Sequence, residues 1–169
     1  MTPLIASLYM ASAASLTVGL LAGTVWLIRR GPGHYGWFGL AAIAAGASMF
    51  AEPLMYQATS VEEFVTALRW QISFIAVFLF GFTWFLKGYG RVERSRTAYA
   101  IVAVVVVLAA VNLALPDTLL YSEVSGLRAI ELPWGEVVVF AEGTAPAYWP
   151  LVNLPGVLMV ILFVAGVRR

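Results

Sequence analysis

The chain has 169 residues, of which 62% are hydrophobic and 11% are charged, and its mean hydropathy is +0.89. Soluble domains carry about 25% charged residues, so this composition indicates an integral membrane protein. Because the chain contains no cysteine and only one histidine, His34, thiolate metal sites, disulfides and histidine metal clusters within one chain are excluded. The formal net charge of +1 does not indicate a nucleic-acid partner, and we expect neither nucleic acid nor a cofactor to bind.

Five segments are long and apolar enough to cross the hydrocarbon core of a bilayer, which takes about 20 helical residues. The sequence therefore predicts an all-α membrane bundle, forming one domain, with helices near 4–28, 35–58, 67–88, 97–115 and 149–167. No basic residue precedes the first segment, so we interpret it as a retained helix rather than a cleaved signal peptide.

The basic residues gather at alternate ends of these segments. One set of ends carries Arg29, Arg30, Lys87, Arg91, Arg94, Arg96, Arg168 and Arg169. The other set carries only Arg69 and Arg128, together with most of the acidic residues. By the positive-inside rule, this distribution predicts an external N-terminus and a cytoplasmic C-terminus.

The longest predicted connection is the external loop at 116–148. It contains two strand-like runs, RAIEL and EVVVFA, separated by the turn sequence PWG. We therefore expect a β-hairpin that covers the outer face of the bundle, with an unstructured loop as the alternative.

Glu52 is an unusual residue in the second predicted helix, because it lies in an apolar run and is followed by Pro53. Small residues lead to it along one helix face, and such faces let membrane helices approach closely. We expect Glu52 to pair with Arg69 or to hydrogen-bond to Gln71, forming the polar floor of a pocket that opens outward. A structural ion pair, or contact with interfacial water, is the alternative.

Several polar and aromatic residues are predicted to share the depth of Glu52 near the outer membrane surface. The candidate ligand-binding residues are Glu52, Tyr56, Arg69, Trp70, Gln71, Asn112, Asn153 and Trp149. The alternatives are interhelical hydrogen bonds for the amides and packing, lipid contact or interfacial anchoring for the aromatic residues. The opening of the last helix, YWPLVNLPG, also predicts a bend.

No arrangement of residues indicates catalysis or transport. The single histidine lies in a predicted cytoplasmic turn, whereas the carboxylates lie mostly on the other side, so we expect this chain not to be an enzyme. Lys87, the only lysine, lies at a helix end and not inside a helix, which argues against a retinal Schiff base. Five unequal helices also lack the paired halves typical of transporters.

Residues 37–91 resemble the N-terminal seven-helix sensor region of bacterial histidine kinases and related signalling proteins. The matching positions are Glu52, Trp70, Gln71, Tyr89, Gly90 and Arg91, and the later stretch IELPWGEVVVFAEGTAPAYW at 130–149 resembles that family's external hairpin and aromatic helix entrance. The third helix departs from the family pattern by lacking a proline at its middle, and five helices are present in place of seven.

The resemblance implies a sensory module of the bacterial cytoplasmic membrane. Such a module would bind a small or apolar ligand, or sense the bilayer, and relay helix motion to a cytoplasmic output domain beyond this sequence. The resemblance also implies a homodimer. Two alternatives remain open: a self-contained five-helix protein that binds or carries a small molecule, and a structural subunit of a membrane complex.

Overall fold

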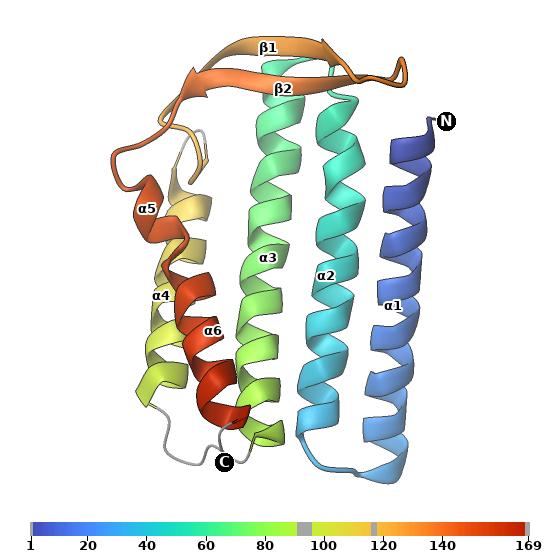
Figure 1. Ribbon diagram of the computed structural model, residues 1–169, viewed down its shortest axis with the longest axis vertical. Coiled ribbons are helices and arrows are strands. Elements are labelled where there is room, and N and C mark those ends of the chain that lie inside the picture. The colour runs from blue at the N-terminus through green and yellow to red at the C-terminus, as the bar shows by residue number, and fades with distance from the viewer. Residues whose placement is uncertain (1, 91–95, 116–117, 168–169) are drawn as a thin grey trace.

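A computed structural model describes residues 2–90, 96–115 and 118–167 of the chain (Figure 1). In chain order its elements are α1 (Pro3–Arg29), α2 (His34–Tyr56), α3 (Val61–Tyr89), α4 (Arg96–Ala114), β1 (Glu123–Glu131), β2 (Val137–Thr144), α5 (Trp149–Val152) and α6 (Leu154–Val167). Helices α1 to α4 are each long and apolar enough to cross a membrane, as expected of a multi-pass membrane protein.

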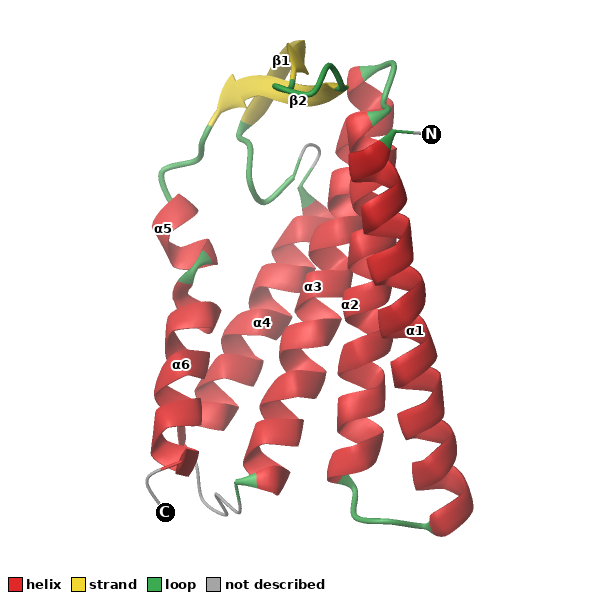
Figure 2. Cartoon of the chain, turned by 45° about the vertical axis from the view of Figure 1, so that its right-hand side comes forward, coloured by secondary structure: helices red, strands yellow, loops and turns green. Residues whose placement is uncertain are grey.

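The helices run roughly parallel to one axis, and α2 lies between α1 and α3 (Figures 1 and 2). Strands β1 and β2 form an antiparallel hairpin that crosses one end of this row, paired from Glu123 opposite Thr144 to Glu131 opposite Val137 with one register shift between Val124 and Gly126. The predicted hairpin is thus confirmed. We call this end of the molecule the hairpin end.

The last predicted helix, 149–167, is interrupted at a single residue. The structure divides it at Asn153 into α5, with 4 residues, and α6, with 14 residues. Pro155 explains the break, because proline has no N–H to donate to the preceding helical turn and its ring clashes with that turn. The predicted bend is confirmed, whereas α6 spans about 21 Å at 1.5 Å per residue and is shorter than a bilayer core.

Helix α3 begins six residues earlier than its predicted start at 67 because its first turn is capped. The hydroxyl of Ser60 accepts a hydrogen bond from the Glu63 N–H at 3.2 Å. In return, the Glu63 carboxylate accepts from the N–H and hydroxyl of Thr59, both at 2.8 Å. Reciprocal bonds of this kind stabilise a helix start, and hydropathy alone does not reveal them.

Small residues bring α1 and α2 into close backbone contact. A Cβ atom added at Gly46 would lie 2.7 Å from the Leu16 Cγ, and one added at Gly19 would lie 2.7 Å from the backbone nitrogen of Ile43. The Ser12 hydroxyl also donates to the Gly46 carbonyl at 2.7 Å. Membrane helices associate through this kind of packing, because lipid provides no hydrophobic driving force between them.

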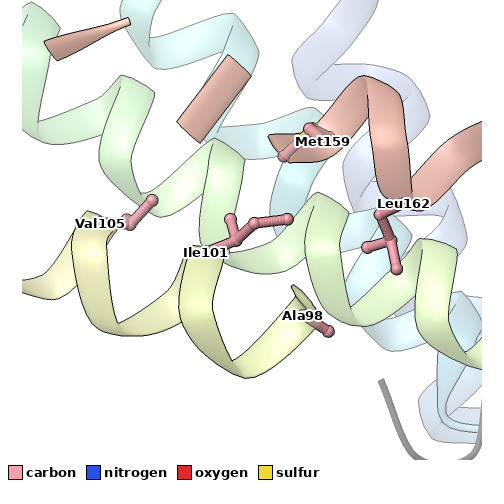
Figure 3. Packing of buried hydrophobic residues seen from close by; sticks show 5 residues of the cluster. All are labelled: Ala98, Ile101, Val105, Met159 and Leu162. Atoms are coloured by element: carbon pink, nitrogen blue, oxygen red, sulfur yellow. The ribbon is translucent and has the colours of Figure 1, made fainter. Parts of the chain in front are cut away.

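Two buried clusters hold the rest of the fold together. One joins α4 to α6 through Ala98, Ile101, Val105, Met159 and Leu162 (Figure 3). The other lies at the hairpin end, where Met55, Phe64 and Leu68 of α2 and α3 pack against Leu127 and Ala141 of the hairpin. The hairpin is therefore docked on the helices by apolar contacts.

Candidate functional site

A groove of about 610 Å³ opens at the hairpin end, across α1, α2 and α3. Small-molecule sites commonly measure about 300–1,000 Å³, so this groove has the size of a ligand site. It is lined by Tyr9, Leu54, Gln57, Ala58, Ser60, Glu62, Glu63, Thr66, Ala67 and Trp70.

Helix α3 supplies one wall of the groove. Glu62, Thr66 and Trp70 recur at intervals of four residues, which places their side chains on one helix face. Trp70 is 58% exposed, and its ring stacks on that of Phe74 at a centroid distance of 5.9 Å. The capped start of α3 is what extends this face as far as Glu62.

Helices α1 and α2 supply the remaining surface. Leu54 lies in the last turn of α2, and Gln57 and Ala58 follow it. Tyr9 reaches the groove from α1, and its ring lies against that of Phe50 on α2 at a centroid distance of 5.4 Å. The groove therefore combines apolar residues with aromatic rings and polar side chains from separate helices.

The charged groups in the lining are both carboxylates. Glu63 is engaged in the helix cap with Thr59, whereas Glu62 forms no hydrogen bond or ion pair within the described part of the chain. No lysine, arginine or histidine lies among the lining residues. The groove is thus electronegative at the start of α3.

Of the eight predicted site residues, Trp70 alone lies in the groove lining. Glu52 instead accepts a hydrogen bond at 2.7 Å from the hydroxyl of Tyr56, one turn further along α2. The Tyr56 ring meets that of Phe140 on β2 at a centroid distance of 5.7 Å. Glu52 and Tyr56 therefore lie beneath the hairpin and help to seat it.

Arg69 and Asn112 come together between α3 and α4. The Arg69 guanidinium donates to the Leu115 carbonyl at 3.0 Å, and the Asn112 amide donates to the Arg69 carbonyl at 3.1 Å. Asn112 is fully buried, and its side-chain oxygen accepts from the N–H of Leu119 at 3.3 Å. This network joins two helices to the segment that leads into the hairpin.

The remaining candidates lie apart from that network. Gln71 is half-buried on α3. Asn153 is exposed and donates to the Trp149 carbonyl at 3.4 Å, while the Trp149 side chain is 49% exposed. A shared depth predicted from the sequence does not specify which way a side chain faces around its helix, and the predicted cluster is therefore divided among several places.

The tip of the hairpin makes a polar contact with the start of α1 that the sequence did not reveal. Glu136 is 4% exposed and its carboxylate accepts hydrogen bonds from the Thr2 hydroxyl, from the Leu4 N–H at 3.2 Å and from the Trp134 indole at 3.0 Å. Burial opposes ionisation, but these hydrogen bonds outweigh it and lower the pKa of Glu136 below its ordinary value. Glu136 thereby caps α1, where a negative charge also complements the helix dipole.

Two further results bear on the chemistry of the site. No group of three or more histidine, cysteine or acidic residues is placed to hold a metal ion anywhere in the described ranges. Comparisons with models of known protein families, with curated proteins and with solved structures find no match. The resemblance of 37–91 to a sensor region therefore remains a hypothesis.

Proposed function

We propose that the protein is a membrane-embedded input module that binds a small molecule in the groove at the hairpin end. One observation supports this proposal above all: the groove has the volume of a ligand site and is built by three successive helices. A molecule held between Tyr9, Gln57 and Trp70 would touch α1, the end of α2 and α3 at once. Its binding would favour one relative arrangement of these helices over another.

The packing of α2 suggests how such a change would reach the other end of the bundle. Close glycine contacts join α2 to α1, and Gly81 of α3 approaches the backbone of Ala41 on α2. Near the far end of α3, the Lys87 ammonium lies over the rings of Trp84 and Tyr99 at 4.6 and 4.7 Å, which links α3 to α4. A shift of α3 at the groove would thus be transmitted through closely packed helices.

The end of the bundle opposite the hairpin carries Arg29, Arg30 and Lys87, and by the positive-inside rule it would face the cytoplasm. In this proposal the module lies in a bacterial cytoplasmic membrane and passes helix displacement to a cytoplasmic output domain, in a homodimer. These features rest on the sequence resemblance and the charge distribution.

Co-purification tests whether the groove holds a molecule. The substitution Thr66→Trp places a large ring in the groove from an exposed position, whereas Ala103→Trp places the same ring at an exposed position on α4 outside the groove. Small molecules retained by each purified variant in lipid nanodiscs would be compared by mass spectrometry. We expect a compound that wild type and Ala103→Trp retain and Thr66→Trp loses; identical profiles for all three would contradict the proposal.

A further inference from the structure

We infer that the groove at the hairpin end recognises an alkylammonium group. This inference rests on the proposed function, because it names the chemical class of the ligand for the same groove. It follows from the charge of the lining, from its aromatic rings and from its apolar residues.

The charge of the lining favours a cation. Glu62 and Glu63 contribute two carboxylates, and no basic side chain among the lining residues balances them. Glu63 keeps its charge while it caps α3, and Glu62 has no partner within the described residues. An anionic ligand would be repelled by both groups, whereas a cation would gain from both.

The aromatic residues favour an organic cation over a metal ion. Trp70 on α3 and Tyr9 on α1 both line the groove, and Trp70 is 58% exposed. The faces of such rings attract ammonium groups within about 6 Å, and aromatic cages bind quaternary ammonium ligands in this way. The described residues also contain no cluster of acidic side chains suited to a metal ion.

The apolar residues of the lining account for the alkyl part of the ligand. Leu54, Ala58 and Ala67 lie in the same lining as the carboxylates. Alkyl groups on nitrogen would contact these residues while the positive charge lies near Glu62. The ammonium could belong to a free molecule or to the headgroup of a lipid, since both present the same chemistry.

A pair of isosteric probes tests the inference. Choline and 3,3-dimethylbutan-1-ol share a shape, but a neutral carbon replaces the charged nitrogen in the second. Their binding to the full chain in phosphatidylglycerol nanodiscs, which contain no ammonium headgroup, would be measured by saturation-transfer NMR titration. We expect choline to bind about tenfold more tightly, since ring and carboxylate interactions each give a few-fold preference at exposed sites.

Variants identify the groups responsible. Glu62→Gln should weaken choline binding about threefold and leave the alcohol unchanged, whereas Trp70→Leu should weaken choline binding about threefold more than it weakens binding of the alcohol. Glu123→Gln is the matched control, because Glu123 is an exposed glutamate on β1 outside the lining, and it should change neither affinity. An equal loss of choline affinity in Glu62→Gln and Glu123→Gln would overturn the assignment of the binding site to this groove.

The outcomes separate this inference from the proposed function. Equal affinity for both probes, or binding of neither, overturns the ammonium inference; a compound lost only from Thr66→Trp would still support the groove as a ligand site. If choline binds and phosphatidylethanolamine in the nanodisc competes with it, the ammonium belongs to a lipid headgroup. If choline binds equally well with that lipid present, a free cation is the ligand.

Discussion

Replacing Asn112 by leucine should destabilise the bundle more than any other single amide replacement in its described helices. Asn112 is fully buried between α3 and α4, donates to the Arg69 carbonyl at 3.1 Å and accepts from the Leu119 N–H at 3.3 Å. Leucine has a similar size and suits an apolar helix, so the change removes hydrogen bonds without opening a large cavity.

The magnitude follows from those contacts. Interhelical hydrogen bonds in membranes contribute about 0.6 kcal/mol on average. Leu119 is 2% exposed, and leaving its N–H without an acceptor would cost about 1–3 kcal/mol. We therefore expect Asn112→Leu to lower the free energy of unfolding by about 2–3 kcal/mol.

Asn153 provides the matched control, since it is an exposed asparagine whose amide bonds only within its own turn, at 3.4 Å. Asn153→Leu should change the free energy of unfolding by less than about 0.5 kcal/mol. Both variants would be unfolded reversibly in mixed detergent micelles and followed by circular dichroism. Equal stability of Asn112→Leu and wild type, or an equal loss in both variants, would refute the assignment of Asn112 as the buried link between α3 and α4.

Three other changes test separate parts of the structure. Gly46→Ala should destabilise the α1–α2 contact by about 1–3 kcal/mol, because the added Cβ would lie 2.7 Å from the Leu16 side chain. Gly23→Ala is the control in the same unfolding assay: a Cβ there would have no atom within 4 Å, so this variant should be neutral or stabilising. Because the pKa of Glu136 is lowered on folding, its contribution to docking the hairpin is complete above the pKa of an unfolded glutamate and is lost as the pH falls through the lowered value. The protection of β2 against hydrogen exchange, expressed relative to the intrinsic exchange rate at each pH, should therefore fall at acid pH in wild type, and Glu136→Gln should show the lower protection already at neutral pH. Equal protection of wild type and Glu136→Gln at every pH would argue against this role. Ser60→Ala should cost about 1 kcal/mol and speed exchange in the first turn of α3, while unchanged exchange there would show that the cap is dispensable.

Much of the helical framework follows from hydropathy, because a bilayer core requires long apolar helices. The first four helices were predicted near their observed positions, and the hairpin was predicted from two β-rich runs around PWG. Of the small residues predicted to lie on one face of α2, Ala41 is 2% exposed, whereas Ala45 and Ser48 are half-buried. These features depend on local sequence patterns.

The candidate site was harder to predict because it depends on which helix faces meet. Glu62, Thr66 and Trp70 form a periodic face, but that pattern is recognisable only once Ser60 and Glu63 are seen to start α3 early. Nothing in the sequence brings Tyr9 to the same groove, since it lies on another helix. The contact of Glu136 with the start of α1 is likewise a long-range result of hairpin docking.

Cysteine labelling tests the proposal that the groove at the hairpin end is open to water on the outer side of the membrane. The native chain has no cysteine, so Thr66→Cys and Ala103→Cys each introduce a single thiol. A membrane-impermeant thiol reagent would be added to sealed vesicles of known protein orientation, and the modified fraction followed by mass spectrometry. We expect rapid modification of Thr66→Cys from the outer side and little modification of Ala103→Cys, because thiolate formation requires water. An unreactive Thr66→Cys, or one modified only from the cytoplasmic side, would contradict it.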